Sequence, residues 1–110
     1  MANKDYRKRL KKAIRDLHGV GATWVATTPV HEVFNGQTVW MGDVEMFILT
    51  GHPKTDTCYA WSYFEGENNE TEQFVAVLKI PPVESPEAAV KVAMGHAVRE
   101  ARSINKASLN

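Results

Sequence analysis

Apolar residues recur at three- and four-residue steps near the start of the chain. Between Asn3, a candidate N-cap, and His18 they fall on one face of a 3.6-residue period, and basic residues occupy the other faces. Gly19 follows at the position where a left-handed C-terminal cap is favoured. The spacing predicts an amphipathic helix over residues 3–18. Its apolar face is formed by Tyr6, Leu10, Ala13, Ile14 and Leu17.

The middle of the chain predicts four antiparallel strands. Asn35-Gly36 favours a tight hairpin, because both residues tolerate the positive φ of a type I′ turn. Pro29 favours an edge position for the first strand, and the interrupted alternation at Gly42-Asp43 predicts a bulge in the second. The strands are predicted over residues 28–34, 37–50, 57–64 and 73–80.

The last part of the chain predicts a second helix. Ser85-Pro86-Glu87 combines a serine N-cap, a proline at the first helical position and an acid in the first turn. Apolar residues then recur at helical spacing to Ile104, and residues 105–110 are expected to fray. With 110 residues, 44% of them hydrophobic, the chain can form one core. We predict a single α+β domain over residues 1–110, with a helix, a four-stranded antiparallel sheet and a C-terminal helix.

The third predicted strand separates small from bulky side chains. The small ones are Cys58, Ala60 and Ser62, and they alternate with Tyr59, Trp61 and Tyr63. If both helices pack on the small face, the aromatic face is a candidate for binding or self-association, since a monomer seldom exposes a large apolar patch. The fourth strand is apolar at successive positions, which indicates that both faces are covered. Two interpretations remain open: one helix on each face, or a homodimer through the aromatic face.

Charge is unevenly distributed, although the formal net charge is zero. Residues 1–20 carry seven Lys or Arg against two Asp or Glu, and the remainder carries six against eleven. A basic helix suits nucleic acid, because cations that neutralise phosphates supply most of the nonspecific affinity. The candidate contacts are Arg7, Lys8, Lys11 and Lys12, with Tyr59, Trp61 and Tyr63 as candidate stacking surfaces. The alternative is a solvated helix whose charges only aid solubility.

Candidate catalytic groups are sparse. A cysteine nucleophile needs a nearby imidazole or positive charge, and His52 lies close to Cys58 in the sequence. Cys58 is expected on the small face, however, where a buried thiol behaves as a hydrophobe. No His-x-x-x-His pair, glycine-rich phosphate loop or dinucleotide fingerprint is present. We expect a non-enzymatic binding or assembly domain with no catalytic residue, metal or cofactor, and keep the His52 loop as an alternative ligand-binding or catalytic site.

The compartment is indicated by the single cysteine. With Cys58 alone no internal disulfide can form, which suits a reducing cytoplasm. No apolar run approaches the roughly 20 residues that span a bilayer, and the N-terminus has no hydrophobic signal core. A cytoplasmic protein without a membrane segment is the expectation.

Two resemblances bear on these expectations. The predicted order of elements resembles the double-stranded-RNA-binding fold, which implies duplex RNA as a ligand. That family begins its second helix with a lysine-rich run, whereas residues 85–91 of this chain read Ser-Pro-Glu-Ala-Ala-Val-Lys. The stretches 51–54 and 58–62, together with 80–83, resemble small uncharacterised bacterial proteins of about this length. That resemblance implies a bacterial source and no known activity.

Overall fold

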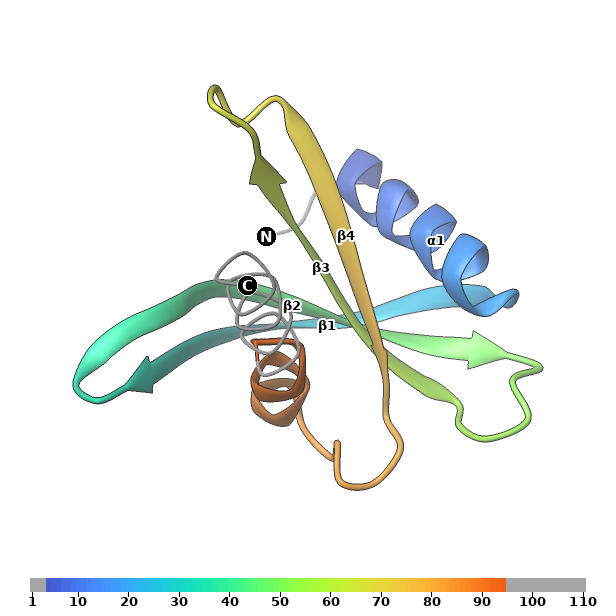
Figure 1. Ribbon diagram of the computed structural model, residues 1–110. Helices are drawn as coiled ribbons and strands as arrows, with labels where there is room; N and C mark the ends of the chain where they lie inside the picture. Colours follow the sequence, from blue (N-terminus) through green and yellow to red (C-terminus); the bar gives the residue numbers. More distant parts are fainter. Residues whose placement is uncertain (1–3, 95–110) are drawn as a thin grey trace, which may run out of the picture.

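The computed structural model describes residues 4–94. The elements in chain order are α1 (Lys4–His18), β1 (Gly21–Phe34), β2 (Gln37–Thr50), β3 (Thr57–Glu65) and β4 (Thr71–Leu78), and a C-terminal helix follows over residues 86–94. The strands form one antiparallel sheet in the order β1-β2-β3-β4 (Figure 1). The predicted α+β architecture is confirmed. The extension of the last helix to residue 104 and the fraying of residues 105–110 lie outside the described residues.

The strand boundaries differ from the prediction mainly at β1 and β4. β1 begins at Gly21 rather than at residue 28, and Pro29 lies within it. The strand accommodates Pro29 because β1 is an edge strand, as expected. β2 has the predicted bounds, whereas β4 ends at Leu78 because the chain turns there, with the Ile80 amide donating to the Leu78 carbonyl.

The bulge predicted at Gly42-Asp43 is wrong. Both residues pair in continuous register with β1, and the irregularities lie instead at Val25 and Val39, which have no opposite residue. Gly42 interrupts the alternation for a reason of packing. A Cβ atom at this position would lie 3.0 Å from Cη2 of Trp40, so the indole occupies the space above the glycine.

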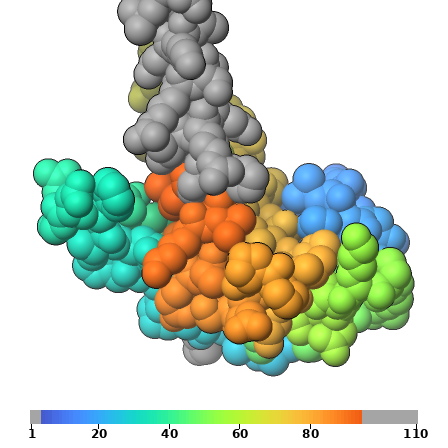
Figure 2. Space-filling view, turned by 60° about the horizontal axis from the view of Figure 1, so that its bottom comes forward, coloured from blue at the N-terminus to red at the C-terminus, as the bar shows by residue number. Residues whose placement is uncertain are grey.

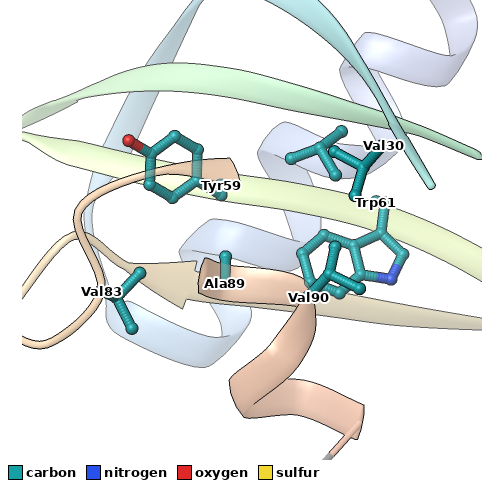
Figure 3. Packing of buried hydrophobic residues seen from close by; sticks show 7 residues of the cluster. Val30, Tyr59, Trp61, Val83, Ala89 and Val90 are labelled. Carbon is teal, nitrogen blue, oxygen red and sulfur yellow. The ribbon is translucent and has the colours of Figure 1, made fainter. Parts of the chain in front are cut away.

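The two helices cover opposite faces of the sheet. The face under α1 carries Cys58 and Ala60, whose small side chains allow the helix to pack closely. The α1-side core consists of Leu10, Ile14, Phe47, Leu49, Cys58 and Ala60. The core under the C-terminal helix consists of Val30, Val44, Tyr59, Trp61, Val83, Ala89 and Val90, most of which Figure 3 labels. The predicted parity of β3 is confirmed, with small and bulky side chains on separate faces.

The aromatic face of β3 is therefore not free. Trp61 is only 3% exposed and lies against Ala89 and Val90 of the C-terminal helix (Figure 3). The homodimer through the aromatic face depended on both helices packing on the small face, and the structure does not have that arrangement. One helix on each face, the other interpretation of the sequence, is what the structure has.

The hairpin of β1 and β2 extends well beyond the rest of the sheet. β2 pairs with β3 only over residues 45–48, so residues 28–44, which we call the hairpin arm, form a two-stranded ribbon with its turn at Asn35-Gly36. Figure 1 shows the arm in teal, projecting away from α1 and β4. The radius of gyration is 14.9 Å, against about 13 Å for a compact domain of 100 residues, in keeping with this extension.

Candidate functional site

The outward side of α1 carries a cluster of exposed cations. Leu10 and Ile14 are fully buried and fix the inward side of the helix. At 3.6 residues per turn, five cations fall within an arc of about 100° on the opposite side. They are Lys4, Lys8, Lys11, Lys12 and Arg15, all exposed, and we call them the basic face of α1. The same helix thus joins an apolar docking side to a cationic outer side.

Little within residues 4–94 neutralises this face. Lys12 pairs with Asp16 at 2.9 Å, one turn along the helix, but both side chains are exposed, and such pairs contribute little. Arg9 projects toward β4 and pairs with Glu72 at 3.0 Å, so it is not part of the basic face. Among the described residues, no ion pair involves the other four cations of the face. Their charge is available to an anion arriving from solvent.

Two polar anchors hold α1 in this orientation, and the first lies at Tyr6. Its hydroxyl accepts a hydrogen bond from the Ser62 amide at 3.0 Å and lies 3.3 Å from the Ser62 hydroxyl oxygen. The Ser62 hydroxyl also lies 2.8 Å from Glu72 Oε2, and the other carboxylate oxygen of Glu72 accepts from Arg9. This chain of contacts fixes the N-terminal half of the helix to β3 and β4.

The second anchor contains Arg7, which the sequence placed with the candidate phosphate contacts. The structure separates it from them: the Arg7 guanidinium carbon lies 3.5 Å from the centre of the Trp24 ring, and Nε is buried without a hydrogen-bond partner. Arg7 holds α1 against β1 and is turned away from the outer side. As a phosphate contact Arg7 stays a prediction: on the helical wheel it lies at the border between the buried side and the basic face, about 20° from Ile14 and about 40° from Lys11.

Lys8, Lys11 and Lys12, the other predicted contacts on this helix, do share one exposed face. The sequence prediction omitted Lys4 and Arg15, which lie on the same side. Helical spacing alone could have found them, because Lys4, Lys8, Lys11 and Arg15 follow one another at steps of four, three and four residues.

Under this second anchor lies a buried carboxyl group, that of Glu45, which the sequence analysis did not single out. Glu45 is fully buried, and its Oε1 accepts hydrogen bonds from Trp24 Nε1, at 2.8 Å, and from the Thr27 hydroxyl. Its Oε2 is buried and has no partner. A signal was present, because Glu45 alternates with Phe47 and Leu49 on the core face of β2. The group is closed to solvent, so it supports Trp24 and does not meet a ligand.

The aromatic residues predicted as stacking surfaces do not join the basic face. Tyr59 and Trp61 are 2% and 3% exposed and lie on the other side of the sheet, so no ring face is open to a base. Trp61 contacts Trp40 instead, with ring centres 5.7 Å apart and planes inclined by 59°. The stacking role is wrong for these two residues because the C-terminal helix covers them. Tyr63 is 42% exposed, on the part of β3 beyond its pairing with β2.

The His52 loop lies at the C-terminal end of α1. The imidazole ring of His52 meets the ring of His18 edge to face, with ring centres 6.5 Å apart. Nδ1 of His52 accepts a hydrogen bond from the Lys54 amide. Cys58 is fully buried in the α1-side core, and burial raises the pKa of its thiol to about 12. A thiol held protonated in this way is not a nucleophile at neutral pH. Within residues 4–94, no group of three or more His, Cys, Asp or Glu is placed to hold a metal ion.

The chain matches none of the protein-family models, curated proteins or solved structures with which it was compared. In the described part of the chain, no helix has both the length and the apolar character needed to cross a membrane.

Proposed function

We propose that the protein is a binding domain for a polyanion, that the ligand is the phosphate backbone of a nucleic acid, and that the basic face of α1 is the binding surface. The observation that carries the proposal is the division of α1 into two sides. Leu10 and Ile14 fasten one side to the sheet, while five cations occupy the other. Solvation alone requires polar residues on the outer side, and here the outer side carries five charges of one sign in a chain of zero net charge.

The dimensions of the face suit a row of phosphates. At about 1.5 Å rise per residue, Lys4 and Arg15 are about 16 Å apart along the helix axis. Two of the other three cations lie between them on the same line, and duplex DNA carries one charge per roughly 1.7 Å of its axis. The face therefore meets several phosphates at once and releases their counterions.

The rigidity of α1 also favours binding. The anchors at Tyr6 and Arg7 and the buried Leu10 hold the helix before a ligand arrives, so binding costs little backbone ordering. Lysine and arginine contacts to phosphates carry no sequence information. Since Trp61 is buried and supplies no stacking platform, we expect binding that depends on charge and not on base sequence.

The test is the salt dependence of binding to short fluorescent duplex and single-stranded nucleic acids, followed by anisotropy with the full chain. The logarithm of the association constant is expected to fall linearly with the logarithm of salt concentration, with a slope of about −4 for four or five phosphate contacts. The triple substitution Lys8→Gln, Lys11→Gln, Arg15→Gln should reduce this slope by about 3 and weaken binding at low salt by roughly tenfold or more.

The matched control neutralises the same number of exposed cations elsewhere. Lys54, Lys79 and Lys91 lie in a loop, after β4 and in the C-terminal helix, and are all exposed. Their triple substitution to Gln makes the same change in net charge but should leave most of the affinity and the slope intact. Equal losses in the two triple variants, or no binding by the wild type at low salt, would refute the proposal.

A further inference from the structure

The hairpin arm carries more exposed apolar surface than a ribbon in water would be expected to hold. Four of its large apolar side chains are exposed, including Met41 at 72% and Phe34 at 67%; the others are Val33 and Val39. A two-stranded ribbon is at best marginally stable in water, and exposed apolar side chains concentrated in one place typically mark an interaction site. In Figures 1 and 2 the arm (teal) and α1 (blue) lie on opposite sides of the molecule, so the arm is separate from the basic face.

One edge of the arm is open to another strand. Residues 37–44 of β2 pair with β1, but within the described chain they have no strand partner on the side of β3. This edge contains no proline and no lysine, and Asp43 is its only charged residue. Natural sheets usually protect an exposed edge with such residues, and β1 does carry Pro29 in its half of the arm. The β2 edge has neither residue, and its only irregularity is the extra residue at Val39.

We infer that this edge pairs with the same edge of a second copy of the chain, forming a homodimer. An antiparallel strand can pair with its own copy about a two-fold axis, which makes a closed, isologous interface. The proposal is independent of the polyanion function, because it uses neither α1 nor its cations.

The charge pattern of the edge fits a second copy. If the two-fold axis passes near Met41, Asp43 of each copy lies opposite Val39 of the other, and no like charges meet. Met41 of each copy then lies opposite Met41 of the other at the centre, and the exposed side chains of the arm gain a partner surface. Any register centred between residues 39 and 42 keeps the two Asp43 carboxylates apart.

The first test measures the molar mass of the full chain by sedimentation equilibrium over two decades of concentration. We expect a dimer for the wild type and a monomer for Met41→Lys, since a lysine on the edge opposes pairing. The control is Ile48→Lys, which places the same charge on an exposed residue of β2 that is already paired with β3. Circular dichroism should show that both variants keep the wild-type fold. A monomeric wild type, or a control that dissociates as fully as Met41→Lys, would overturn the inference.

The second test does not depend on a destabilising charge. Cys58 is the only cysteine and is buried, so a cysteine introduced elsewhere is the only accessible thiol. Directly opposite residues of paired strands have Cβ atoms about 4.5–5.5 Å apart, close to the separation in a disulfide. Met41→Cys should form a covalent dimer on mild oxidation. Thr23→Cys, which is exposed near the start of β1 and far from the hairpin arm, should not. Equal cross-linking of both variants would indicate random collision and count against the paired arms.

Discussion

Replacing Trp61 by alanine tests whether this ring belongs to the core or to a binding surface. The indole is 3% exposed and packs between the sheet and the C-terminal helix. An aromatic side chain of this size buries about 200 Å², which at about 25 cal/mol per Å² corresponds to about 5 kcal/mol. Tryptophan-to-alanine substitutions in cores cost about 3–5 kcal/mol. We expect a loss of unfolding free energy in that range.

The assay is urea unfolding followed by far-ultraviolet circular dichroism, which does not depend on the removed fluorophore. With a slope of about 1.5–2 kcal/mol per M, the midpoint should fall by about 1.5–3 M. The control is Phe64→Thr, which removes an exposed ring from the same strand and keeps a β-favouring residue, and should cost less than about 1 kcal/mol.

A second measurement separates the two roles of Trp61 directly. Trp61→Leu keeps an apolar side chain in the core but removes the ring that a base would stack on. Its affinity for nucleic acid should equal that of the wild type. A loss of affinity in Trp61→Leu, or a Trp61→Ala variant as stable as Phe64→Thr, would show that the ring is not where the packing places it.

Two further substitutions probe buried polar groups in the α1-side layer. Glu45→Leu leaves the donors of Trp24 and Thr27 unpaired and should lower the unfolding free energy by about 2–4 kcal/mol. Glu45→Gln keeps an acceptor and should cost less than half as much in the same urea assay. Equal losses of unfolding free energy in the two variants would contradict this role of Glu45. The pKa of Cys58 is raised from 9.0 to about 12 on folding, so its contribution to stability is complete below pH 9 and falls by about 1.4 kcal/mol per pH unit as the pH rises toward 12. Cys58→Ala should remove this part of the alkaline loss, and an unchanged pH dependence of unfolding would show that the thiol does not cause it.

Local patterns were enough to predict the elements of this fold. The helical spacing before Gly19, the Asn35-Gly36 turn and the serine N-cap before Pro86 act over a few residues, and each is realised close to its predicted place. The parity of β3 was also readable, because alternation is a property of the strand itself. Which helix covers which face was not, because both faces of β3 are apolar and the choice depends on partners far away in the sequence.

The functional residues divide in the same way. Lys8, Lys11 and Lys12 could be placed on one exposed face from helical spacing alone. The same spacing puts Arg7 close to Lys11, and only its contact with Trp24 of β1 sets it apart. The role of Glu45 could not be predicted from its own strand, since its donors Trp24 and Thr27 come from β1. The burial of Trp61 likewise depends on Ala89 and Val90, which follow it by almost thirty positions in the sequence.

The short ladder between β2 and β3 has a mechanical consequence. The ladder between the two hairpins covers residues 45–48 and 57–60 and is extended by one hydrogen bond, from the Leu49 amide to the Asp56 carbonyl; beyond this seam the hairpins diverge (Figure 1). The angle between the two hairpins therefore depends less on this short ladder than on the helix that packs across it. α1 contacts β1 on one side of the seam and β3 and β4 on the other. A force applied to the outer surface of α1 is therefore transmitted to both hairpins.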